Sequence, residues 1–205
     1  SGLDSSALFE SSMPADKKHV LIALSYASSL DSGGGTEMMS ALRLALRDEQ
    51  RSGYLKQIIF ITDGSVGNEA ELFTVVASKI GEARMFAVGI GSAPNGYFMR
   101  KAAELGRGSF TIIDNIREVE ERMSELFATL EHPMVTGLAF NWLGARNISI
   151  YPDPLPDLYA GVPLIFTARM AEDTDAIAIS GRMRGNTWNT SIPVAQARSA
   201  KGIAR

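Results

Sequence analysis

The sequence contains no cysteine, which excludes disulfide bonds and thiolate-bound metals and is compatible with either a reducing or an oxidising compartment. It contains only two histidines, His19 and His132, so few side chains are available as general bases. No stretch approaches the roughly 18 consecutive apolar residues of a membrane-spanning helix. Lys and Arg form no concentrated run, and the formal net charge is −3. The charge pattern argues against a nucleic acid as the main partner.

The sequence does contain enough apolar residues for a buried core, since 45% of its 205 residues are hydrophobic. Between residues 17 and 130, segments with helical spacing of apolar residues alternate with short apolar runs typical of strands. The expected strands are QIIFIT, MFAVGIG and SFTIID, at residues 57–62, 85–91 and 109–114. The expected helices are residues 17–30, 37–50, 68–80, 95–106 and 116–130. This alternation predicts an α/β fold with a doubly wound (Rossmann-like), mostly parallel sheet.

Some local features sharpen this prediction. The run QIIFIT is continuously apolar apart from its ends, which is typical of a parallel strand buried on both faces. Asn68 is expected to cap the helix that ends at Ile80. The last helix has the clearest apolar stripe, which we expect to pack on the sheet. This stripe consists of Ile116, Val119, Met123, Leu126, Phe127 and Leu130.

The pattern changes at Glu131-His132-Pro133. The segments that follow are short, partly alternate between apolar and polar residues, and are separated by Pro, Gly, Asp and Asn. They are VTGLAFNW, NISIY, PLIFTARM, AIAISGRM and TWNTSIPV. We interpret residues 1–131 as the α/β domain and residues 132–205 as a small antiparallel β unit.

A glycine-rich stretch, LDSGGGTEMMSAL at residues 30–42, precedes one of the expected helices. Such a stretch suits a phosphate-binding loop, a hinge or a metal-ligating loop. A phosphate-binding loop needs Lys followed by Ser or Thr after the glycines, whereas here Glu37 follows Thr36. The segment GIGSAPNG also departs from the GxGxxG pattern of dinucleotide-binding loops. The sequence therefore disfavours nucleotide binding.

Two oxygen-bearing side chains remain as a candidate site. Asp63 follows the strand QIIFIT at its carboxyl end, where ligands bind in open α/β sheets. Thr36 begins a helix at the same edge of the sheet, after glycines that allow a close approach. A hydroxyl and a carboxylate suit a hard cation such as Mg²⁺, which prefers oxygen ligands. The structural alternative is that Thr36 is a helix cap and Asp63 a turn residue before Gly64.

The order of three segments carries a family resemblance. GGGTEMMSAL, IIFITDGSVGNE and MFAVGIGSAPNGYFMRKAAELGRGSFTIID resemble consecutive parts of a von Willebrand factor type A domain, over most of residues 7–131. The most similar subtype is that of inter-alpha-trypsin inhibitor heavy chains and their bacterial surface relatives, including sortase-anchored target proteins. YPDPLPDLYAGVPLIFTARM resembles the β segment that follows the A domain in those proteins. The resemblance implies a location outside the cytoplasm, at the cell surface or secreted.

The resemblance also implies a metal-ion-dependent adhesion site. Thr36 and Asp63 match the threonine and the aspartate of that site, which holds Mg²⁺, or Mn²⁺ or Ca²⁺, and binds an acidic group of a protein partner. The DxSxS motif of the site has no match here, because Leu8 stands where the second serine is required after Asp4 and Ser6. We therefore expect a non-enzymatic adhesion or protein-binding module whose metal site is incomplete in this chain.

By the same resemblance, the chain is expected to begin after the family's first strand, first helix and second strand. The first strand would lie beside residues 57–62, so its loss is expected to leave an apolar sheet edge. Self-association, or rearrangement of SSALF at residues 5–9, would cover that edge. Two other functions remain open. One is a metal-independent structural or assembly scaffold, and the other is an α/β hydrolase, for which Ser65 is the candidate nucleophile.

Overall fold

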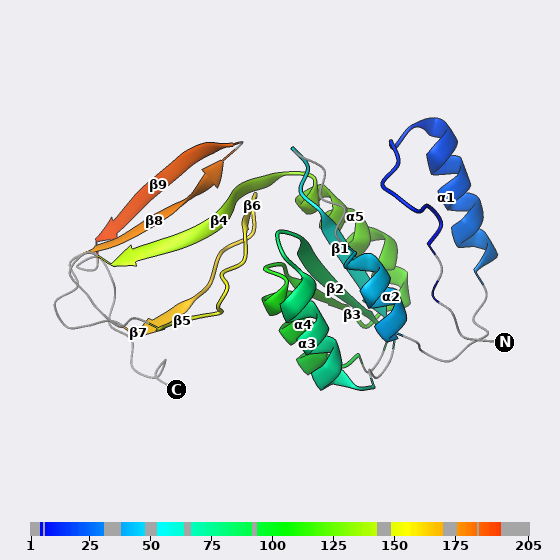
Figure 1. Ribbon diagram of the computed structural model, residues 1–205, viewed down its shortest axis with the longest axis horizontal. Coiled ribbons are helices and arrows are strands. Elements are labelled where there is room, and N and C mark those ends of the chain that lie inside the picture. Colours follow the sequence, from blue (N-terminus) through cyan, green and yellow to red (C-terminus); the bar gives the residue numbers. More distant parts are fainter. Residues whose placement is uncertain are drawn as a thin grey trace.

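The computed structural model describes residues 5, 7–30, 38–47, 53–63, 67–91, 94–142, 149–169, 176–183 and 185–193. Figure 1 shows an α/β body, a group of antiparallel strands at one end of the molecule, and the N-terminal helix at the other end. Within the described ranges, no helix combines the length and the apolar character that crossing a membrane requires.

The α/β body contains the three strands that the sequence predicts. They are β1 (Gln57–Thr62), β2 (Arg84–Ile90) and β3 (Phe110–Ile113). They are parallel and lie in the order β1-β2-β3. This confirms a mixed α/β fold with a parallel sheet. The order runs in one direction only, so the reversal of strand order that defines a doubly wound sheet stays a prediction.

Helices cover both faces of this sheet, as the alternation of strand side chains requires. On one face, Ile58 of β1 and Met85 of β2 pack against three helices, with Leu72, Val76 and Met99 at the centre of the cluster. These helices are α2 (Met38–Ala45), α3 (Glu69–Lys79) and α4 (Gly96–Leu105). On the other face, Phe86 and Val88 of β2 pack against α5 (Val119–Leu130).

The last helix is shorter than its apolar stripe predicts. It begins with a 3₁₀ turn, η1 (Ile116–Glu118), before α5. The side chain of Ile116 is 77% exposed and that of Phe127 is 46% exposed, so the prediction that both pack on the sheet is wrong. Leu126 and Leu130 are buried in the contact with the sheet, and Val119 and Met123 are partly buried against it.

Three loops border α3 and α4. Asn68 precedes α3 as predicted, but it adopts a left-handed conformation (φ 55°) and its side chain makes no capping hydrogen bond. The side chain of Asn95 caps α4 instead, accepting a hydrogen bond from the Phe98 N–H at 3.0 Å. After α4, Gly108 passes so close to β2 that a Cβ atom there would lie 2.1 Å from the Met85 carbonyl oxygen.

The N-terminal helix α1 (Lys17–Ser29) has no buried residue. Its apolar side chains are largely exposed, with Leu21 at 55% and Leu24 at 59%. Asp16 caps its first turn, and the ring of Phe9 meets that of His19 edge-on at 5.8 Å. Figure 1 shows this helix beyond β1 and α2, separated from the parallel sheet. The apolar face of α1 therefore contributes little to the core.

The residues after α5 form antiparallel strands, as predicted. A four-stranded sheet has the order β6-β4-β8-β9, and a two-stranded sheet joins β5 and β7. The two-residue strand β6 was not expected from the sequence. The strands are β4 (Pro133–Trp142), β5 (Ser149–Tyr151), β6 (Leu158–Tyr159), β7 (Thr167–Arg169), β8 (Ala176–Met183) and β9 (Asn186–Pro193).

A buried ion pair joins these strands to the parallel sheet. Arg84, at the start of β2, donates hydrogen bonds from Nε and Nη2 to the two carboxylate oxygens of Asp157. The side chains of Arg84 and Asp157 are 2% and 0% exposed. The same carboxylate accepts a hydrogen bond from the Gly137 N–H of β4 at 3.1 Å. Asp157 therefore connects β2, β4 and the segment before β6, and Tyr159 packs its ring against Phe86 beside it.

Candidate functional site

Asp63 lies directly after β1 and is exposed at the carboxyl end of the strand. Thr62, the last residue of the strand, is buried, so the chain leaves the core between these two residues. The end of β2 is close by, because a Cβ atom on Gly91 would lie 3.7 Å from the Asp63 carbonyl oxygen. Asp63 is thus placed where a ligand at the carboxyl edge of the sheet could reach its carboxylate.

Several predicted site residues lie outside the described residues. Thr36 and the glycines before it are among them, as are Ser65, Asp4 and Ser6. The pairing of Thr36 with Asp63 therefore stays a prediction.

Sequence reasoning missed a second polar contact at this edge. Glu69 opens α3 and Asn95 precedes α4, and both helices begin at the carboxyl edge because they follow β1 and β2. The Asn95 side-chain amide donates a hydrogen bond to the Glu69 carboxylate. The only signal in the sequence was an acid in the first helical turn after Asn68, which does not identify its partner. The contact fixes the two helix starts relative to each other.

Two other described acids, Glu69 and Asp114, lie at this edge, but they form no metal-binding cluster with Asp63. Across the part of the chain that the structure describes, no three His, Asp or Glu side chains gather closely enough to hold a metal ion. Asp114 follows β3, and the intervening strand separates it from Asp63 by two strand spacings, about 9–10 Å. One exposed carboxylate is a suitable ligand for a hard cation, which would take its other ligands from Thr36 and from water.

The two histidines have ordinary structural contacts. His19 Nδ1 lies 2.8 Å from the Asp16 carboxylate, whose pKa is lowered mainly by the hydrogen bond from the His19 backbone N–H. His132 Nδ1 lies 3.3 Å from the Ala128 carbonyl oxygen at the end of α5. Neither contact involves a hydroxyl nucleophile, so the described residues give no geometric support to a hydrolase triad.

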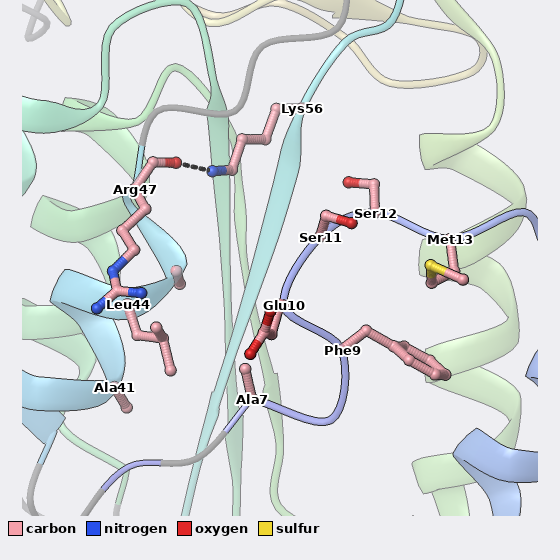
Figure 2. Close-up of a pocket in the computed structure, with 11 residues that line it drawn as sticks. Ala7, Phe9, Glu10, Ser11, Ser12, Met13, Ala41, Leu44, Arg47 and Lys56 are labelled. Atoms are coloured by element: carbon pink, nitrogen blue, oxygen red, sulfur yellow. Dashed lines mark hydrogen bonds between the residues drawn. The ribbon is translucent and has the colours of Figure 1, made fainter.

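β1 is the outer strand of the three-stranded sheet, and among the described strands it pairs only with β2. Ile61 is 53% exposed, so the strand is less buried than its apolar sequence predicts. Residues 7–13 face a cavity of about 810 Å³ that α2 and Lys56 also line, as Figure 2 shows. The Lys56 ammonium donates to the Arg47 carbonyl oxygen across this cavity. Among the described residues, no backbone hydrogen bond joins residues 7–13 to β1, so this segment adds no strand to the sheet.

Comparison with known proteins gives a consistent family match. A family model described as the von Willebrand factor type A domain matches residues 1–112. A von Willebrand factor A domain-containing protein of Dictyostelium discoideum is 26% identical over 144 residues, which is 70% of this chain. Inter-alpha-trypsin inhibitor heavy chain H4 of Bos taurus is 23% identical over 193 residues, or 88% of this chain. The latter match extends well past the residues of the family model.

A solved structure supports the fold. The von Willebrand factor type A protein from Catenulispora acidiphila matches with a TM-score of 0.58 and 18% identity, over 88% of this chain and 51% of that one. The chain spans only 16% of the Dictyostelium protein and 21% of the bovine heavy chain. These matches therefore concern one region of longer proteins.

Proposed function

Because this chain belongs to the von Willebrand factor type A domain family, we propose that it is a non-enzymatic protein-binding module with its binding site at the carboxyl edge of the parallel sheet. Domains of this family are generally protein-interaction modules. The observation that carries the proposal is the position of Asp63, an exposed carboxylate directly after β1. An acidic group on the protein partner would reach this edge through a bound cation.

Thr36 and Asp63 are the proposed protein ligands of that cation, with Mg²⁺ as the first choice and Mn²⁺ or Ca²⁺ as substitutes. Two protein oxygens, only one of them charged, leave Mg²⁺ mostly hydrated, and the cation then gains little over water. The stretch that should supply further ligands has Leu8 in place of a serine. We therefore propose that the site is incomplete in this chain and holds the metal weakly.

The proposed subtype is that of the inter-alpha-trypsin inhibitor heavy chains. The match to the bovine heavy chain covers 88% of the chain and so includes antiparallel strands after residue 132, whereas the family model ends at residue 112. With this subtype comes the proposal of a location at the cell surface or in the extracellular space. In proteins of this subtype, the antiparallel strands would then regularly follow the A domain, and here the ion pair of Arg84 and Asp157 would hold them to it.

Two alternatives belong to other classes of function. A metal-independent scaffold would bind partners without using Asp63. An α/β hydrolase would need Ser65 as a nucleophile, and the Ser65→Ala variant would then lose hydrolysis of a test ester such as p-nitrophenyl acetate. We expect Ser65→Ala to leave this background hydrolysis unchanged, because neither histidine contacts a hydroxyl nucleophile among the residues that the structure describes.

Thermal unfolding in the presence of Mg²⁺ or Mn²⁺ tests the proposal. A site with a dissociation constant of about 1 mM would stabilise the folded chain by about 1.4 kcal/mol at about 10 mM metal. We expect a measurable stabilisation of up to this size, relative to EDTA. It should be absent in Asp63→Ala and retained in Asp114→Ala, which removes a carboxylate from the same edge two strands away.

Other outcomes would change the proposal in defined ways. A stabilisation of about 2.7 kcal/mol or more, lost in Asp63→Ala, would mean that the site is complete in this chain. An equal stabilisation in Asp63→Ala would place the metal elsewhere. No metal effect in any variant would favour the metal-independent scaffold.

A further inference from the structure

A second concave site lies at the opposite edge of the parallel sheet from Asp63. It is a cavity of about 630 Å³ between α4, the start of β3 and the segment of residues 151–167. Phe110, the first residue of β3, and Gly108 line it, so it opens at the amino edge of the sheet. Asp63 lies at the carboxyl edge. A ligand in this cavity would therefore be independent of the proposed metal site.

The cavity is large enough for a specific ligand, since binding pockets typically measure about 300–1,000 Å³. Its walls are largely apolar, and several of its apolar side chains are exposed rather than packed. Ile165 is 79% exposed, Tyr151 56%, Val162 43% and Phe110 36%. Exposed apolar side chains that gather around a hollow are a common feature of binding sites, and aromatic residues are enriched in protein interfaces.

One positive charge, Arg100, faces this apolar surface, and no described carboxylate forms an ion pair with it. The guanidinium of Arg100 lies 5.6 Å from the centre of the Phe110 ring. No carboxylate forms an ion pair with it among the residues that the structure describes. Glu104, one turn further along α4, is already engaged, because it accepts a hydrogen bond from the Tyr151 hydroxyl and pairs with Lys101 at 3.9 Å. Among the described residues, Arg100 therefore has the Phe110 ring but no carboxylate as a partner, which leaves its donors available to an anion.

These observations together define the ligand chemistry. The rim formed by Phe110, Tyr151, Val162 and Ile165 is apolar, and Arg100 beside it favours a carboxylate. We propose that this amino-edge pocket binds an extended peptide segment of a protein partner, with a bulky apolar side chain in the cavity and a nearby acidic side chain on Arg100. Charge-assisted hydrogen bonds from Arg to carboxylates are among the stronger polar contacts, so Arg100 would set the preference for an acid. This site would serve partners that the metal site does not reach.

A library of short labelled peptides tests the proposal. Each member is an acetylated, fluorescein-labelled pentapeptide whose second and third positions vary over Leu, Phe, Trp and Pro, and whose fifth position is Glu or Gln. Binding is measured by fluorescence polarisation in EDTA, so that metal plays no part. The variants are Arg100→Gln and Ile165→Ser, with Lys101→Gln as the matched control. This control removes one positive charge from the adjacent residue of the same helix, which does not line the cavity.

We expect some Glu peptides to bind at least about tenfold more tightly than their Gln counterparts. Arg100→Gln should abolish this preference and Lys101→Gln should keep it. Ile165→Ser should weaken the binding of Glu and Gln peptides alike. Because Ile165 is highly exposed, its replacement should not unfold the chain, so misfolding would not explain the loss of binding. The proposal is overturned if no member binds below about 1 mM, if Glu and Gln peptides bind equally, or if Arg100→Gln binds like the unmodified chain. Saturable binding of octanoate in a calorimetric titration, with no peptide binding, would assign the cavity to a small apolar acid instead.

Discussion

Replacing Asp157 with alanine would leave the guanidinium of Arg84 buried without a counter-charge. Both side chains are almost fully buried, at 2% for Arg84 and 0% for Asp157. The carboxylate also accepts the Gly137 N–H, so the substitution removes a third hydrogen bond. Breaking a buried ion pair by removing one partner typically costs about 3–5 kcal/mol. That is a large share of a total stability of about 5–15 kcal/mol.

Urea unfolding followed by circular dichroism measures this cost. With a slope of about 3 kcal/mol per molar urea, the Asp157→Ala variant should unfold at a urea concentration lower by about 1–2 M. Asp153→Ala is the matched control, because Asp153 lies in the same segment and is exposed. The double variant Arg84→Met with Asp157→Asn should recover most of the loss, since no buried charge remains and the amide oxygen can still accept the Gly137 N–H.

The reasoning would be refuted if Asp157→Ala cost less than about 1 kcal/mol, the range of exposed ion pairs. It would also be refuted if the double variant were less stable than Asp157→Ala. Either result would mean that water reaches Arg84 and that the antiparallel strands are held to the parallel sheet by other contacts.

Three further predictions concern single positions. Gly108→Ala should destabilise the chain by about 1–3 kcal/mol in the same urea assay, because its Cβ would lie 2.1 Å from the Met85 carbonyl oxygen. A neutral effect would mean that the loop moves freely away from β2. Burial raises the pKa of the Tyr159 phenol in the folded chain above its ordinary value of 10.0. The free energy of unfolding therefore does not depend on this group below that pH, and it falls above that pH because the unfolded chain loses the proton first. Tyr159→Phe should therefore lose less stability above this pH, and should cost little at neutral pH because the hydroxyl lies near Gln57 without a well-formed hydrogen bond, since the Gln57 amide donates instead to the Leu130 carbonyl oxygen; an unchanged alkaline profile would contradict this. The chain should self-associate through the outer edge of β1, and Ile61→Lys should shift it to a monomer in size-exclusion chromatography with light scattering. If the unmodified chain is already a strict monomer, this edge has no role in self-association.

The parallel strands and their helices could be predicted because their signals are local. A continuous apolar run such as QIIFIT, bounded by turn residues, differs clearly from the helical spacing of its neighbours. The same periodicity shows neither where a helix extends past the sheet, as at Ile116, nor which flank of its apolar stripe faces solvent, as at Phe127, so both were wrongly assigned to the core. The two-residue strand β6 is too short to carry a periodic signal at all.

Contacts between distant segments were beyond sequence reasoning. Arg84 and Asp157 are 73 positions apart, and each alone resembles an ordinary surface charge. The position of Asp63 could be predicted, because the residue after a parallel strand must lie at the carboxyl edge. Its partnership with Thr36 was inferred only from family resemblance, and spacing along the chain cannot establish it.

Titration with Mn²⁺ followed by electron paramagnetic resonance tests the central proposal most directly, because the signal of free Mn²⁺ falls as the ion binds. We expect one weak site with a dissociation constant of about 1 mM or higher, lost in both Thr36→Ala and Asp63→Ala and retained in Asp114→Ala. Binding in the micromolar range, or binding that survives Asp63→Ala, would contradict an incomplete metal site built on Thr36 and Asp63.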